Sequence, residues 1–284
     1  METTLNAILT YLSYGFIQRA FIIGILTALL SSILSVYFVL KRLSLIGDGL
    51  AHTAYGGIAI GLAVGGLVPS LAGNAYVIGG AIVVAGSILI TKAIRSAKFS
   101  GDAAVAIFMT LGLATGVFVT SVTLQYGFDL DALLFGSILL VTWNQIYAAA
   151  LILVPTIVLV TVFYKELLYT VFEEVQARAA GIVTWKFDYL LSILAGLAVV
   201  VAIPIVGVLL ISALLVLPAL ASIQITRSFK QTILLSPILG SVSVILGLFF
   251  SIIEPDAAPG GTIVLAGLAI LLLAILAKKI RRSA

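Results

Sequence analysis

Long apolar runs recur along the whole chain of 284 residues. Each run is close to the ~20 residues that a helix needs to cross the hydrocarbon core of a bilayer, and none shows the short alternating pattern of a membrane β-barrel strand. The chain is 62% apolar and 9% charged, whereas a soluble domain is roughly half apolar and a quarter charged. The sequence therefore predicts an all-α integral membrane protein, a polytopic bundle of eight or nine transmembrane helices in contact with membrane lipid.

Nine of these runs are candidate spans: residues 17–40, 44–66, 75–94, 102–124, 143–164, 187–204, 205–225, 231–253 and 261–278. Residues 132–141 are apolar but too short to cross, and Pro204 lies between two runs that no charged residue separates. Irregular backbone is tolerated at membrane depth where it lines a cavity or is buried in protein. Two points are therefore open within one transmembrane domain, residues 1–284: whether residues 132–141 form a re-entrant or interfacial piece, and whether residues 203–217 form a kinked or re-entrant element.

The positions of lysine and arginine indicate how the chain is oriented. These residues collect in cytoplasmic loops, and nine spans with the N-terminus outside leave Arg19 as the only one of the 15 Lys and Arg residues on the outer side. We therefore expect a multi-pass protein of the cell (cytoplasmic or inner) membrane with its C-terminus in the cytoplasm. This topology accounts for the net charge of +4 without nucleic acid as a partner.

The segment Lys41 to Gly66 places two ionisable residues inside the membrane. Asp48 and His52, the only histidine of the chain, are four residues apart, and such residues share one face of a helix; Ser44 and Tyr55 fall on the same predicted stripe. Ionisable side chains within a span are costly and mark functional sites. An oxygen and a nitrogen donor together suit Zn²⁺, Mn²⁺ or Fe²⁺ better than Ca²⁺, Mg²⁺ or Cu(I).

Three interpretations of this pair remain open on the residues alone: a metal site, a structural polar pair and a proton relay. An aspartate in the first turn of a helix is favoured by the helix dipole whatever its function. Two side chains are too few for a closed metal site, but two copies of the chain facing each other would supply two Asp and two His. The same helix carries Gly57, Gly61 and Gly65 at a spacing of four, which predicts close packing against a neighbouring helix.

The sequence SLIGDGLAHTAYGGIAIG within this segment resembles the signature of the ABC-3 family, the permease subunits of bacterial and archaeal ABC importers for zinc, manganese and iron. In that family a basic pair precedes Ser-Leu, Gly-Asp-Ala-Leu-Ser-His and a helix rich in small residues. Here Gly49 replaces the usual Ala and Ala51 the usual Ser, while Asp48 and His52 stand. The likeness continues in the expected order through residues 100–104, 134–139, 172–182, 205–219 and 255–261, and thus covers roughly residues 17–278.

The resemblance implies a homodimeric pore of eight or nine helices per protomer, two cytoplasmic ATP-binding-cassette ATPase subunits and an extracellular or periplasmic metal-binding protein. It implies that Asp48 and His52 hold the metal in transit. The divalent metal ion, Zn²⁺, Mn²⁺ or Fe²⁺, would be the substrate, and we expect no permanently bound cofactor. A secondary transporter or channel that uses Asp48 and His52 as a proton or ion relay is the alternative.

The chain contains no G-x-x-x-x-G-K-[ST] phosphate-binding loop, so we expect a transport subunit that is not itself an enzyme. ATP hydrolysis would then belong to a separate chain. The segment FEEVQARAAG, residues 172–181, resembles the coupling loop of ABC importer permeases and predicts a cytoplasmic coupling helix at about 170–183. Glu173, Glu174 and Arg178 would supply polar contacts, and Gly181 would be the C-cap. The alternative is an amphipathic helix that lies on lipid.

Overall fold

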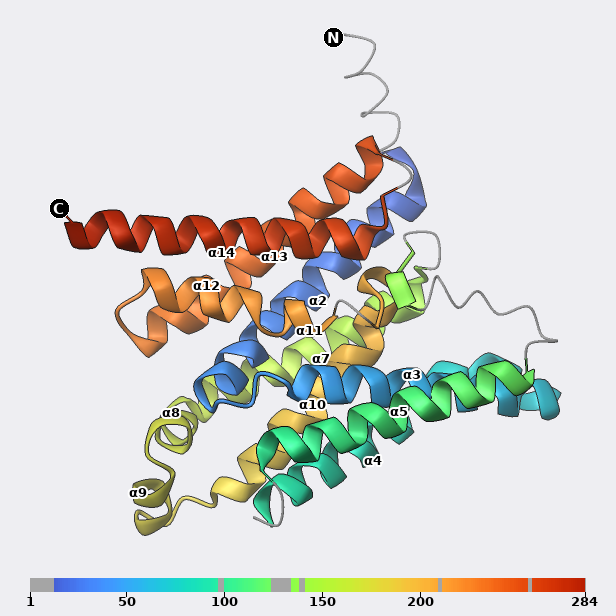
Figure 1. The fold of residues 1–284 in the computed structure, drawn as a ribbon, viewed down its shortest axis with the longest axis horizontal. Coiled ribbons are helices and arrows are strands. Elements are labelled where there is room, and N and C mark those ends of the chain that lie inside the picture. The colour runs from blue at the N-terminus through green and yellow to red at the C-terminus, as the bar shows by residue number, and fades with distance from the viewer. Residues whose placement is uncertain are drawn as a thin grey trace, which may run out of the picture. The chain divides into compact units, whose positions relative to one another are not determined.

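The computed structural model describes residues 13–96, 100–123, 134–137, 141–208, 211–254 and 257–283. Within these ranges the chain contains helices and no strand, and eight helices are long and apolar enough to cross a membrane (Figure 1). The predicted all-α polytopic membrane fold is therefore confirmed. The eight helices are α2 (Gly15–Leu40), α3 (Ile46–Leu67), α4 (Ala75–Arg95), α5 (Gly101–Thr123), α7 (Trp143–Val162), α10 (Thr184–Val206), α13 (Phe229–Ile253) and α14 (Pro259–Ser283).

The predicted span 205–225 is not a single helix: within the described residues eight helices, the lower of the two numbers expected, are long and apolar enough to cross a membrane. α10 ends at Val206, and Gly207 follows with φ of +78°. A β-carbon at Gly207 would lie 2.3 Å from the carbonyl oxygen of Leu134, so both the backbone conformation and the close contact require glycine. The apolar run then continues as two short helices, α11 (Ile211–Leu214) and α12 (Leu217–Ile225), and Pro218 lies in the first turn of α12.

Of the expected short apolar element at 132–141, residues 132, 133 and 138–140 lie outside the described residues.

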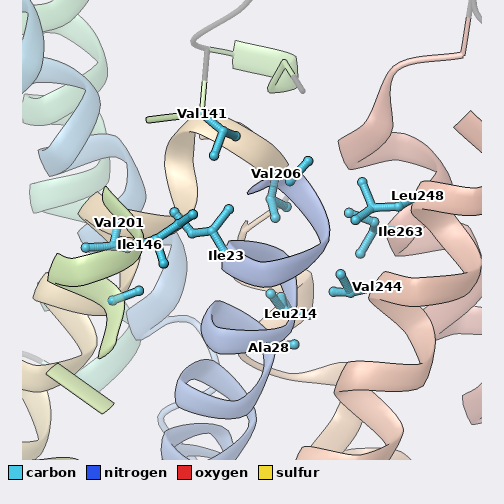
Figure 2. Close-up of a cluster of buried hydrophobic side chains, with 12 residues drawn as sticks. Ile23, Ala28, Val141, Ile146, Val201, Val206, Leu214, Val244, Leu248 and Ile263 are labelled. Atoms are coloured by element: carbon cyan, nitrogen blue, oxygen red, sulfur yellow. The ribbon is translucent and has the colours of Figure 1, made fainter. Parts of the chain in front are cut away.

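The described residues of Met1–Val36, Asp131–Val154 and Val201–Ala284 form one compact unit. Aliphatic side chains from six helices meet in its core, as Figure 2 shows for Ile23 of α2 and the residues around it. The cluster consists of Ala20, Ile23, Ala28, Val141, Ile146, Ala149, Val201, Val206, Leu214, Val244, Leu248 and Ile263. Within this unit α14 packs along α12 and α13, and the hydroxyl of Ser236 on α13 donates a hydrogen bond to the Ser32 carbonyl of α2 at 2.9 Å.

The described residues of Tyr37–Leu130 and Pro155–Val200 form the second compact unit. α3 packs against both α4 and α5, and Figure 1 shows the three helices side by side in blue, teal and green. A β-carbon at Gly57 would lie 3.1 Å from the Gly79 carbonyl oxygen of α4, and one at Gly61 would lie 2.4 Å from the Ala75 carbonyl oxygen. The predicted close packing through Gly57 and Gly61 is confirmed, and α4 is the partner helix.

Three further short elements belong to this unit. A 3-10 helix, η1 (Pro69–Asn74), joins α3 to α4, and α8 (Tyr164–Phe172) and α9 (Glu174–Ala179) lie between α7 and α10. α5 starts after Ser100, whose hydroxyl accepts a hydrogen bond from the Ala103 N–H at 3.2 Å, as expected for an N-cap serine. α3 differs, because its N-cap residue makes no side-chain hydrogen bond.

Candidate functional site

The start of α3 determines where Asp48 and His52 lie. The helix begins at Ile46, and Asp48 lies in its first turn. At 1.5 Å per residue His52 is about 9 Å from the first residue of the helix. Ser44 precedes the helix, so the prediction that it lies on the same helical stripe is wrong. Tyr55 is only 3% exposed and its ring lies against Gly116 of α5, where an added β-carbon would be 2.2 Å from the ring, so Tyr55 serves packing.

Asp48 and His52 lie one helical turn apart on α3, and both side chains are partly exposed. The Asp48 carboxylate interacts electrostatically with the His52 ring. The Nδ1 atom of His52 is buried and makes no hydrogen bond. A buried polar atom without a partner is costly. A bound cation would remove this cost by accepting the lone pair of the Nδ1 atom.

The backbone of α3 at His52 is held by α5. A β-carbon at Gly112 of α5 would lie 2.4 Å from the His52 carbonyl oxygen and 2.6 Å from the Thr53 nitrogen. The packing is reciprocal, because a β-carbon at Gly56 of α3 would lie 2.6 Å from the Gly112 carbonyl oxygen. Direct backbone contact of this kind fixes the height of His52 along α5 with little freedom.

The donor set of a single chain is small. Within the part of the chain that the structure describes, no group of three or more His, Cys, Asp or Glu side chains could hold a metal ion. Asp48 and His52 supply one oxygen and one nitrogen donor type, and a closed site requires four ligands. The pair can therefore contribute to an ion site whose remaining ligands come from another chain or from water.

The predicted coupling segment, at about 170–183, contains the end of α8 and the whole of α9. Gly181 has φ of +82°, and the N–H of Ile182 donates to the Ala177 carbonyl at 2.9 Å while the N–H of Gly181 donates to the Arg178 carbonyl at 3.0 Å. These two bonds are those of a Schellman motif. Gly181 thus ends α9, but Ala180 is the C-cap, so the predicted cap position is off by one residue.

The polar residues of the coupling segment differ in their surroundings. Glu173 is exposed, whereas Glu174 accepts hydrogen bonds from Arg178 and from the Thr184 hydroxyl, the latter at 3.2 Å. Burial acts to raise the pKa of Glu174, but the hydrogen bond from Arg178 and the positive charge of Lys41 outweigh it, so the pKa lies below its usual value. Two of the three predicted polar contacts, Glu174 and Arg178, are therefore engaged within the chain.

Sequence reasoning missed the residues to which Glu174 is connected. Arg95 at the end of α4 reaches Glu174 and also pairs with Asp188 of α10, which pairs in turn with Lys41. One feature of the sequence does point to Asp188: it is an acidic residue at the edge of the candidate span 187–204. An ionisable residue in that position calls for a partner, but no spacing rule names residues so far away in the chain.

Comparisons with known proteins agree with the motifs. Residues 13–278 match the ABC 3 transport family. The manganese transport system membrane protein MntC of Listeria innocua is 30% identical over 93% of this chain and 91% of its own length. A protein of Haemophilus influenzae named a probable iron transport system membrane protein is 32% identical over 92% of this chain and 89% of its own length.

The fold is also shared with a solved structure. PsaBC from Streptococcus pneumoniae, solved in complex with Fab, superposes with a TM-score of 0.81 at 28% sequence identity and covers 95% of both chains. The family match spans most of the chain, the relatives align along nearly their full length, and the helices superpose as well. The chain therefore belongs to the ABC 3 transport family.

Proposed function

We propose that the chain is the transmembrane permease of an ATP-binding-cassette importer for a divalent transition metal, with Mn²⁺ as its main substrate. The observation that carries the proposal is the pair on α3, a partly exposed carboxylate one turn from an imidazole whose buried Nδ1 has no partner. Oxygen and nitrogen donors together suit Mn²⁺, Fe²⁺ and Zn²⁺. Manganese is named for the relative in Listeria innocua and also for one in Streptococcus gordonii, and iron for the relative in Haemophilus influenzae, which favours Mn²⁺.

The proposed assembly contains two copies of this permease, whose single transmembrane domain spans residues 1–284, with the basic C-terminus in the cytoplasm. Two copies would supply two Asp48 and two His52 side chains, enough to hold an ion and few enough to release it. A metal-binding protein outside would deliver the ion. Two separate ATPase subunits would supply the energy, since this sequence has no phosphate-binding loop of its own.

The segment at about 170–183 would dock on the ATPase. α9 is short and ends in a rigid Schellman turn, and its Val175 side chain is 82% exposed. An exposed aliphatic residue with polar neighbours suits a protein contact that has an apolar centre and a polar rim. In this proposal Glu173 contacts the ATPase directly, while Glu174 and Arg178 hold the helix in shape and Gly181 ends it.

Uptake of radioactive ⁵⁴Mn²⁺ into proteoliposomes that contain the complex with its ATPase and metal-binding protein tests the proposal. We expect His52→Ala and Asp48→Asn to lose uptake, because each removes a donor, while Asp102→Asn makes the same chemical change at an exposed position of α5 and leaves uptake intact. Undiminished uptake in either variant removes that residue from the ion path. Uptake by the permease alone, driven by a pH gradient, would instead favour a secondary transporter that uses the pair as a relay.

A further inference from the structure

Four charged side chains of the second unit form a continuous series of ion pairs. Asp188 of α10 accepts hydrogen bonds from two cations at once, with Lys41 at Oδ1 and Arg95 at Oδ2. Arg95 also reaches Oε1 of Glu174 on α9 at 3.4 Å. We call these four residues the Asp188 network. It connects α9, the end of α4 and the first turns of α10 with the segment between α2 and α3.

Burial separates this network from ordinary surface pairs. The side chains of Lys41 and Asp188 are 11% and 14% exposed, whereas Arg178, which pairs with Glu174 one turn along α9, is 58% exposed. Exposed pairs contribute little to stability. Removing one partner of a largely buried pair leaves the other charge uncompensated and is costly. The contacts of Asp188 are therefore the ones that constrain the positions of the helices.

Lys41 lies in a tight turn that leads directly into α3. The turn is closed by a hydrogen bond from the Leu43 N–H to the Phe38 carbonyl at 2.8 Å, and Arg42 within it has φ of 59°. Non-glycine residues in this left-handed conformation are strained and persist only where the surroundings hold them. A rigid turn transmits displacement, so a movement of Lys41 reaches the first turn of α3, where Asp48 lies.

The network also has room to rearrange. Its four side chains line a cavity of about 780 Å³ together with Thr91 and Ser192. Ion pairs that line a cavity can exchange partners without displacing packed side chains, unlike a core, which resists deformation. A further cation, Arg42, follows Lys41 in the chain and lines the same cavity.

We propose that Asp188 is a positioning residue that couples the movement of α9 to the start of α3. Displacement of α9 would act on Arg95 through Glu174, and Asp188 would pass it from Arg95 to Lys41. The proposal rests on the proposed function, in which α9 belongs to the segment that docks on the ATPase. It adds the route by which that segment reaches the helix of Asp48 and His52.

The first experiment measures ATP hydrolysis and ⁵⁴Mn²⁺ uptake by the same reconstituted complex. We expect Asp188→Asn to keep hydrolysis while the number of ions taken up per ATP falls about fivefold or more, as for the loss of an ordinary coupling between two sites. Lys41→Met should have a similar effect, and the double variant should be no worse than either single one, because the two residues act as a pair. Lys186→Gln is the matched control, since this exposed residue lies on the same helix outside the network.

The second experiment does not depend on transport. The chain contains no cysteine, so spin labels at Leu45→Cys and Val175→Cys report the distance between the start of α3 and α9 in the purified permease. Both native side chains are exposed. We expect a narrow distance distribution in the otherwise unchanged chain and in Lys186→Gln, and a broad one in Asp188→Asn and Lys41→Met.

The outcomes separate the two proposals. An unchanged ratio of uptake to hydrolysis in Asp188→Asn, or label distances as narrow as in the control, would overturn the coupling role of Asp188. If the unsubstituted complex takes up no metal, the proposed function fails, and the label distances alone decide whether the network joins α9 to α3. If Asp188→Asn does not fold, Lys41→Met carries both measurements, because it leaves Asp188 paired with Arg95.

Discussion

Replacing Gly112 of α5 by alanine is the sharpest test of how α5 positions His52. The added β-carbon would lie 2.4 Å from the His52 carbonyl oxygen and 2.5 Å from its carbonyl carbon. Favourable contacts begin near 3.5 Å, so the two helices must separate by roughly 1 Å. The neighbouring atoms belong to the backbone and cannot rotate away, which places the cost at about 2–3 kcal/mol.

A gain in helix propensity opposes this cost. Alanine is favoured over glycine within a helix by about 1 kcal/mol, so we expect Gly112→Ala to destabilise the protein by a net ~1–2 kcal/mol. At about 2–4 °C per kcal/mol for a protein near this size, the melting temperature in detergent should fall by about 2–8 °C. Gly80→Ala is the matched control, because Gly80 lies within α4 and an added β-carbon there meets no atom within 4 Å. Its melting temperature should stay the same or rise.

The displacement of His52 can be measured separately from stability. His52 is the only histidine of the chain, so its modification by diethyl pyrocarbonate, followed by peptide mass, reports on this one ring. We expect faster modification in Gly112→Ala than in Gly80→Ala, since separation of α3 from α5 frees the backbone at His52, whose side chain is only partly exposed. If Gly112→Ala is as stable as Gly80→Ala and reacts at the same rate, the reasoning that α5 fixes His52 is refuted.

Two further predictions concern the coupling segment. Gly181→Ala should destabilise the turn after α9 by about 1–2 kcal/mol through the positive φ alone, since the new β-carbon meets no atom within 4 Å. Limited proteolysis should therefore cut Gly181→Ala faster there than Gly181→Asn, because asparagine tolerates this conformation; equal rates would contradict the prediction. Because the pKa of Glu174 is below its usual 4.5, the ionised carboxylate stabilises the contacts of α9 fully above pH 4.5, and that stabilisation is lost as the pH falls through the lower folded pKa. Fluorescence of Trp185 in a Trp143→Phe background should follow this transition, and Glu174→Gln should abolish it.

Several features followed from the sequence because they depend on neighbouring residues. The length and polarity of the apolar runs predicted the long helices, and a spacing of four placed Asp48 and His52 one turn apart on α3. The spacing of Gly57 and Gly61 predicted close helix packing. Each of these predictions rests on the fixed rise and turn of the α-helix, because the helical period converts a spacing in the sequence into a position on the helix surface.

Other features were beyond reach of a local reading. The run 205–225 is apolar throughout its length, yet Gly207 takes a left-handed conformation against the backbone at Leu134, and the helix ends there. Average polarity carries no information about that contact. The packing of α3 at His52 likewise depends on Gly112, which belongs to another helix, α5. The spacing of glycines within α5 does not tell which helix packs against it.

The Asp188 network shows most clearly the difference between what the sequence determines and what the tertiary structure decides. The sequence determined that the chain is a membrane protein and where its long helices lie, and it singled out Asp48, His52 and the polar segment at 172–181 as candidates for function. Only the tertiary structure brought Asp188 to Lys41, 147 residues away in the chain, and to Arg95, 93 residues away. A charge near the membrane must find a partner, but which partner it finds is decided by how the helices pack, because pairing across such separations depends on the positions of whole helices and not on the residues that flank the charge.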